Sequence, residues 1–225
     1  MATGSMFPFE ITSSAHLAGV LAMVAFIATG GESTARATEA SVTCGGPAEC
    51  YARGKKTSGS AERRQFFQAG MRAAEARLAT SADDPEGLFW LAVNTGAEAL
   101  ERGKLQALPA VARMEKLLLR CAQVAPAYEH GGAARVLGRL YQKAPAVISV
   151  GSSKNARKWL ERALTIDGEF PGNLAFAADF LSDEGDSARA RVLAQKCLRR
   201  LTTGDFGPEA DEWRDLAREV LGGAS

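Results

Sequence analysis

The chain has 225 residues, of which 46% are hydrophobic, 24% charged and 7% aromatic. This length and apolar content suffice for one domain of ordinary size with a buried core. The formal net charge is only +1 and basic residues are interleaved with acidic ones, so we exclude nucleic acid as a partner, because its binding requires a basic face.

Residues 1–37 are predicted to be a signal peptide or another N-terminal targeting segment. Ala15 to Ala28 form a largely apolar run of 14 residues, which is too short to span a bilayer comfortably. Ala35-Arg36-Ala37 then matches the pattern that signal peptidase cuts. We therefore expect export to the periplasm or envelope, with a mature chain that begins near Thr38. No Lys or Arg precedes the run, which leaves an atypical leader or a different start as the alternative.

Residues 38–60 are predicted to be a loop-rich segment that contains two cysteines, Cys44 and Cys50. In an oxidising compartment this pair can close a disulfide loop. Five residues separate the cysteines, a spacing that does not match a zinc hairpin. Ser-Val-Thr before Cys44 is a poor signal for lipid attachment, so the sequence leaves membrane association open. The basic residues between 53 and 64 are interpreted as a solvated segment.

Residues 61–225 are predicted to form a helical repeat domain, because no stretch shows the alternation of a strand. An amphipathic helix is expected over 61–79. Asp84 and Pro85 then provide an N-cap and a first helical residue for the next helix. Gly131-Gly132 marks a later boundary, and 208–221 form a last amphipathic helix that can cap the open end of a solenoid.

Three stretches of this domain repeat one pattern of small and large apolar residues. The second helix of each copy keeps constant spacing, at positions 114, 118 and 121, then 156, 160 and 163, then 190, 194 and 197. Cys121 and Cys197 are equivalent in this alignment, and we interpret both as buried free thiols. The pattern predicts an all-α solenoid of about three helix–turn–helix repeats with flanking and capping helices.

Leu137-Gly138-Arg139-Leu140-Tyr141, followed by Ala156 and Ala163, resembles the tetratricopeptide repeat (TPR). The longer Gly-Gly…Leu-Gly-x-x-Tyr…Ala-Pro string from Gly131 to Pro145 resembles the T-component proteins of TRAP transporters, which are exported and TPR-like. The resemblance covers residues from about 62 to 205. It implies a TPR-like αα-solenoid that docks a periplasmic solute-binding protein, holds a small hydrophobic ligand, or does both.

Residues with the chemistry to contact a partner or ligand are few. We predict Trp90, Asn94, Arg135 and Tyr141 for the concave surface of the solenoid. Val147 and Ile148 also interrupt the otherwise polar connection over 143–153. Apolar loop residues must be buried against something, which is either the flank of the solenoid or a ligand or partner.

Catalytic chemistry is not predicted. His130 is the one histidine beyond residue 37, so zinc sites built from two or three histidines are excluded, and no nucleophile elbow is found. We predict no catalytic residue, no metal and no cofactor. The leading hypothesis is an accessory of a TRAP-type transport system. The alternatives are a general TPR scaffold for an envelope protein complex without a small-molecule ligand, and a hydrolase that uses His130.

Overall fold

The structure is a computed structural model that describes residues 42–103, 107–146 and 149–222. Within these ranges it contains α-helices and one short 3-10 helix, η1, but no strand, so the all-α prediction is confirmed. The predicted targeting segment 1–37 lies outside the described residues. In chain order the elements are α1 (Pro47–Lys56), α2 (Ser60–Thr80), α3 (Pro85–Arg102), α4 (Leu108–Val124), η1 (Tyr128–His130), α5 (Gly132–Lys143), α6 (Ser153–Ile166), α7 (Pro171–Asp183), α8 (Ser187–Leu201) and α9 (Ala210–Gly222).

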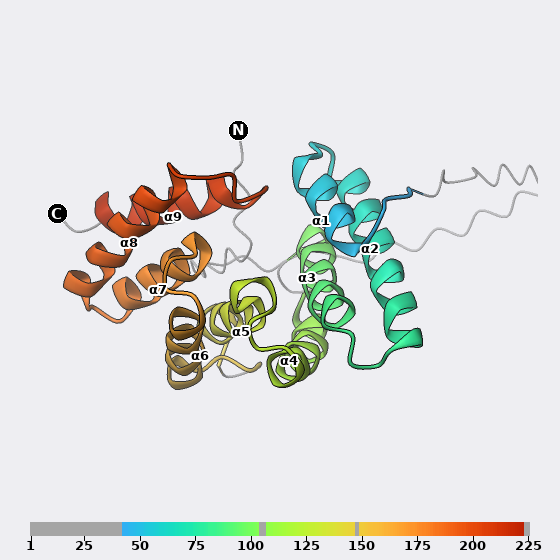
Figure 1. Cartoon of the computed structure of the whole chain (residues 1–225), viewed down its shortest axis with the longest axis horizontal. Coiled ribbons are helices and arrows are strands. Elements are labelled where there is room, and N and C mark those ends of the chain that lie inside the picture. Colours follow the sequence, from blue (N-terminus) through green and yellow to red (C-terminus); the bar gives the residue numbers. More distant parts are fainter. Residues whose placement is uncertain (1–41, 104–106, 147–148, 223–225) are drawn as a thin grey trace, which may run out of the picture.

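The helices follow one another around an arc (Figure 1). The most extensive contacts join α2 to α3, α5 to α6, and α7 to α8, an arrangement that is compatible with stacked helix–turn–helix repeats. Helix α9 packs on both α7 and α8, as expected of a capping helix. The start of α9 lies opposite α1 (Figure 1), and the side chains of Lys55 and Glu212 meet there.

The sequence signals that start helices act as expected. The side chain of Asp84 accepts a hydrogen bond of 2.7 Å from the amide of Gly87. Ser152 caps α6 and Asp186 caps α8 in the same way. Each cap satisfies an amide that would otherwise lack a partner at the helix N-terminus. Gly185 has a φ of 83°, the left-handed conformation that a tight turn between α7 and α8 requires.

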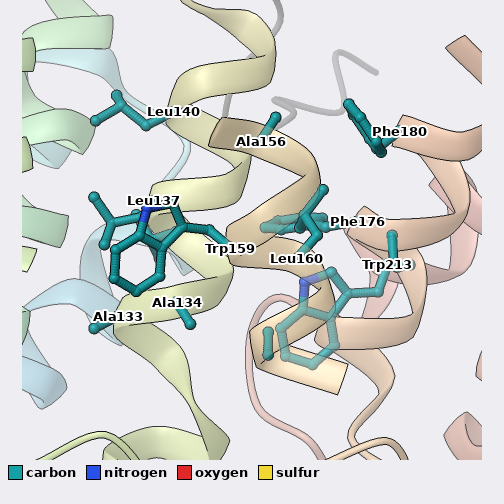
Figure 2. Close-up of a cluster of buried hydrophobic side chains, with 14 of the residues drawn as sticks. Ala133, Ala134, Leu137, Leu140, Ala156, Trp159, Leu160, Phe176, Phe180 and Trp213 are labelled. Carbon is teal, nitrogen blue, oxygen red and sulfur yellow. The ribbon is translucent and has the colours of Figure 1, made fainter. Parts of the chain in front are cut away.

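The repeated positions of the second helices form the centre of the core. All nine are buried, namely Met114, Leu118, Cys121, Ala156, Leu160, Ala163, Ala190, Ala194 and Cys197. Figure 2 shows Leu137, Trp159, Leu160 and Phe176 gathered where α5, α6 and α7 meet. A Cβ on Gly138 would lie 2.5 Å from Cγ of Leu160, so this position requires glycine for α5 and α6 to approach. The two free cysteines, Cys121 and Cys197, are buried as predicted.

One expectation needs correction, because the segment 38–60 contains helix α1. The helix begins with Pro47 at its first position and ends with Lys55 and Lys56 in its last turn, where basic side chains complement the helix dipole. Its buried face carries Tyr51, which packs at 5.9 Å from the ring of Phe67. A helix of ten residues with one short apolar face gives little periodic signal.

The basic residues between 53 and 64 are also less solvated than predicted. The ammonium of Lys55 lies 3.1 Å from a carboxylate oxygen of Glu212. Arg63 forms two hydrogen bonds of 2.8 Å with Glu101. These contacts attach α1 to α9 and α2 to α3. The segment is therefore part of the packed structure.

Candidate functional site

A partly enclosed cavity, called here the central cavity, lies between α3, α5, α7 and α9. Its volume is about 60 Å³, room for about four water molecules at about 15 Å³ each. Helices α4 and α6 lie outside this ring of elements (Figure 1), and no single repeat supplies the whole wall. The lining residues are Phe89, Trp90, Val93, Glu129, Arg135, Val136, Phe170, Phe176, Phe206, Glu209 and Trp213.

Aromatic rings form two opposite parts of the wall. On the first half of the chain, Phe89 and Trp90 of α3 meet edge to face at 5.0 Å. On the second half, the ring of Phe170 lies 5.2 Å from Trp213 and 6.1 Å from Phe206, also edge to face. Such edge-to-face pairs fix ring positions in addition to burying apolar area. Most of the residues that line the cavity are therefore aromatic or aliphatic, but polar atoms contribute about as much of its accessible surface as apolar atoms do.

Arg135 places a cation in this aromatic wall. The residue is only 7% exposed, and its guanidinium lies 4.7 Å from the ring centre of Phe170. Its Nη1 donates hydrogen bonds of 3.1 Å to the carbonyl oxygen of Glu129 and to Oδ1 of Asn173. Burial lowers the pKa of Arg135, but an arginine keeps its proton in proteins. The cavity thus carries a positive charge whose hydrogen-bond acceptors are neutral, while the carboxyls of Glu129 and Glu209 lie in the same lining.

Asn173 at the start of α7 orients this arginine. The residue is fully buried, and its Nδ2 lies 2.9 Å from the carbonyl oxygen of His130 and 2.8 Å from that of Asp167. Because carbonyls surround the amide nitrogen, the amide oxygen must face the other way, toward Arg135. His130 contacts Asp167 through Nδ1 at 2.8 Å and stacks on Phe170 at 4.4 Å, so it supports this turn from outside the cavity lining.

The loop before α9 and helix α1 close one edge of the cavity. Burial raises the pKa of the Glu209 carboxyl, and the cation of Arg135 opposes that shift. The phenol of Tyr51 is hydrogen-bonded to Glu209; burial, followed by the charges of Glu209 and Glu212, holds the pKa of Tyr51 well above its ordinary value. Together with the Lys55–Glu212 ion pair, these contacts join the two ends of the arc.

The structure brings together two of the residues predicted for the concave surface. Trp90 and Arg135 both line the central cavity. Asn94 is fully buried instead, and its Nδ2 donates to the carbonyl oxygens of Pro47 and Trp90 at 3.1 and 2.8 Å. It therefore attaches α1 to α3. Tyr141 is buried as well, and its hydroxyl donates to Glu115, away from the cavity. Val147 and Ile148 lie outside the described residues.

Sequence reasoning missed the side of the cavity that the C-terminal third of the chain supplies. Trp213 lies within the amphipathic helix expected over 208–221 but was not predicted for a site, and Phe170, Phe206 and Glu209 were not singled out. The aromatic spacing of Phe170, Phe206 and Trp213 gives no periodic signal, because loops separate these residues. Phe170 directly precedes Pro171 and Phe206 directly precedes Gly207, whereas Trp213 lies in the first turn of α9.

The structure joins Cys44 and Cys50 in a disulfide whose Cα atoms are 5.5 Å apart. The bond connects the segment before α1 to the first turn of that helix. In the part of the chain that the structure describes, no group of three His, Cys, Asp or Glu side chains is arranged to hold a metal ion. In the same ranges, no helix is both long and apolar enough to cross a membrane.

Comparison with known proteins agrees with the sequence resemblance. The sequence model of the family named TRAP transporter T-component matches residues 48–202, which is more than half of the chain and includes most of α1 and all of α2 to α8. The match ends before Phe206, Glu209 and Trp213, so this wall of the central cavity lies beyond it. No curated protein matches the chain. Because the family match covers most of the folded domain, the chain belongs to the TRAP transporter T-component family.

Proposed function

We propose that the protein holds a small, mainly apolar ligand in the central cavity and docks a periplasmic solute-binding protein of the same transport system. Membership of the family makes the chain an accessory component of a TRAP transporter. The observation that carries the ligand-holding part is the cavity of about 60 Å³ with its aromatic walls. Pockets for small ligands are mostly apolar, preformed, and have a few placed polar groups.

The expected route is export followed by action in the periplasm. The disulfide between Cys44 and Cys50 supports this placement, because structural disulfides persist in oxidising compartments. The targeting segment 1–37 is proposed to direct export. Mass spectrometry of the mature protein from the envelope fraction, expected to begin near Thr38 with the disulfide intact, tests both points.

Native mass spectrometry of the purified protein tests the ligand-holding part. We expect a co-purified small molecule that the Val93→Phe variant lacks, because Val93 lines the cavity and a phenyl group fills it. The same substitution at Val192, which is 62% exposed on α8, is the matched control and should retain the molecule. Circular dichroism and thermal unfolding establish that both variants fold.

A pull-down with the solute-binding protein encoded beside the transporter tests the docking part. Recovery of that protein supports docking. Recovery of envelope structural proteins alone, together with a wild-type protein that carries no small molecule, would contradict the proposal and support the scaffold alternative.

A further inference from the structure

Only one of the three nitrogens of the Arg135 guanidinium, Nη1, donates hydrogen bonds to other residues of the described structure. Nη1 has two acceptors, the carbonyl oxygen of Glu129 and Oδ1 of Asn173. Among the described residues, none accepts a hydrogen bond from Nη2 or Nε, and no carboxylate forms an ion pair with this arginine. Arg139, one turn later on α5, differs in that it forms an ion pair with Asp179.

The unpartnered nitrogens of Arg135 open onto the central cavity. Arg135 lines that cavity, and none of its atoms belongs to the polar atoms that are sealed from solvent without a partner, whereas Nε of Arg139 does. A buried charge is costly unless it is paired and hydrogen-bonded. The stacking on Phe170 and Trp213, at 4.7 and 5.9 Å, offsets part of that cost. An anion in the cavity would complete the pairing.

The chemistry of the free donors selects the kind of anion. Nε and Nη2 of an arginine form a planar fork that matches both oxygens of a carboxylate. The indole N–H of Trp213 also has no partner among the described residues, but it is sealed from solvent, so the donors that a ligand can reach are those of Arg135. The lining around these donors is mostly aromatic and aliphatic, so the remainder of the ligand should be apolar.

The volume of the cavity and the charges of its lining limit the chemical class of the ligand further. The volume of about 60 Å³, equivalent to about four water molecules, admits a carboxylate with a short carbon body. Glu129 and Glu209 line the same cavity, so a second negative charge on the ligand would be repelled. Burial raises the pKa of Glu209, and the cation of Arg135 opposes that shift.

We propose that the central cavity binds a short monocarboxylate with an apolar body, whose two oxygens are received by Nε and Nη2 of Arg135. This inference rests on the proposed ligand-holding function and specifies the ligand's chemical class. It makes Arg135 the residue that determines specificity. It also distinguishes monocarboxylates from dicarboxylates of similar length.

Isothermal titration calorimetry of the mature chain tests the proposal with three probes of similar size. Isobutyrate should bind at least about tenfold more tightly than isobutyramide, its neutral counterpart, and than succinate, a dicarboxylate, because only isobutyrate offers one planar anion. Arg135→Lys should weaken isobutyrate binding by at least about tenfold, since a lysine lacks the fork. Arg135→Met should abolish it.

Arg157→Met is the matched control. Arg157 also stacks on a ring, that of Phe180 at 5.2 Å, but it lies outside the cavity lining and should leave isobutyrate binding unchanged. Thermal unfolding establishes that each variant folds. If the Arg135 variants do not fold, the ranking of the three probes on the wild-type protein still decides the question.

Several results would overturn the inference. Isobutyramide binding as tightly as isobutyrate, unchanged binding in Arg135→Met, or no binding of isobutyrate would each do so. A co-purified neutral molecule that is lost in Val93→Phe would overturn the carboxylate assignment while leaving the proposed function intact. Absence of any bound molecule together with absence of the solute-binding protein would overturn both.

Discussion

Two buried arginines on helix α5 show how one helix supports two different environments. Arg139 is 2% exposed; it stacks on Phe176 at 4.9 Å and pairs with Asp179 of the neighbouring helix α7. Arg135 lies one turn earlier and also stacks on an aromatic ring, yet its hydrogen-bond acceptors, the carbonyl oxygen of Glu129 and Oδ1 of Asn173, are neutral. The region around Arg139 is a closed core in which charges balance each other. The region around Arg135 is a partly open cavity in which the cation forms no ion pair in the described part of the chain, although the carboxyls of Glu129 and Glu209 line the same space.

The largest expected effect comes from breaking the balanced pair. Asp179→Asn removes the charge that Arg139 and Lys143 share and leaves a buried cation without an anion. Breaking a buried ion pair in this way costs about 3–5 kcal/mol. Urea unfolding followed by circular dichroism should show that decrease in the free energy of unfolding.

Arg135→Met should cause no such decrease in the free energy of unfolding when it is measured in the same way. The variant removes a buried charge that forms no ion pair among the described residues, and methionine fills similar space among aromatic rings. We expect the free energy of unfolding to change by less than about 1 kcal/mol or to increase. A loss as large as that of Asp179→Asn would show that Arg135 is a structural residue and remove the contrast between the two regions.

Packing gives a second, smaller contrast between core and cavity. Gly138→Ala places a methyl group 2.5 Å from Cγ of Leu160, and such overpacking costs about 1–3 kcal/mol. Val93→Ile adds a methyl group beside the cavity, where space exists, and should change stability by less than about 1 kcal/mol. Thermal unfolding of both variants measures the difference, and equal losses would show that the cavity wall is as tightly packed as the α5–α6 contact.

The smallest expected effect depends on pH. The pKa of Glu209 is raised in the folded protein, so its contribution to stability is present at low pH and is lost as pH rises through the raised value. Glu209→Gln cannot ionise. Its stability relative to wild type should therefore improve between pH of about 5 and about 8, by about 1 kcal/mol or less because the side chain is partly exposed.

Urea unfolding at both pH values measures this difference for the two proteins. Lys55 and Arg135 oppose the shift of Glu209, whereas Glu212 adds to it. A difference that does not change with pH would show that Glu209 titrates normally and that the cavity edge is well solvated.

The sequence predicted the core better than the cavity. The repeat spacing identified nine buried positions of α4, α6 and α8, because packing between neighbouring helices repeats along the chain. Of the four residues predicted from their chemistry for the concave surface, Trp90 and Arg135 line the cavity. The sequence did not predict that Glu209 and Phe170 would line the same cavity as Trp90 and Arg135. That arrangement depends on the curvature of the whole arc, which no local pattern encodes.

Asn94 and Tyr141 illustrate a second limit. A polar or hydroxyl-bearing residue on an otherwise apolar helix was interpreted as a surface residue. Asn94 instead satisfies a carbonyl of α1, a helix that the sequence did not reveal, and the hydroxyl of Tyr141 finds Glu115 on α4. Most buried polar groups are hydrogen-bonded, here Nδ2 of Asn94 and the hydroxyl of Tyr141, but such partners become known only when the neighbouring elements are known.

The contact between Lys55 and Glu212 joins residues 157 positions apart. In a linear array of repeats each end can unfold on its own, because repeats contact only their neighbours. Here the two ends share a contact, so loss of α9 also weakens the attachment of α1. Hydrogen exchange should therefore show that the amides of α1 and α9 open together. Removal of either helix should also speed the exchange of amides in the other.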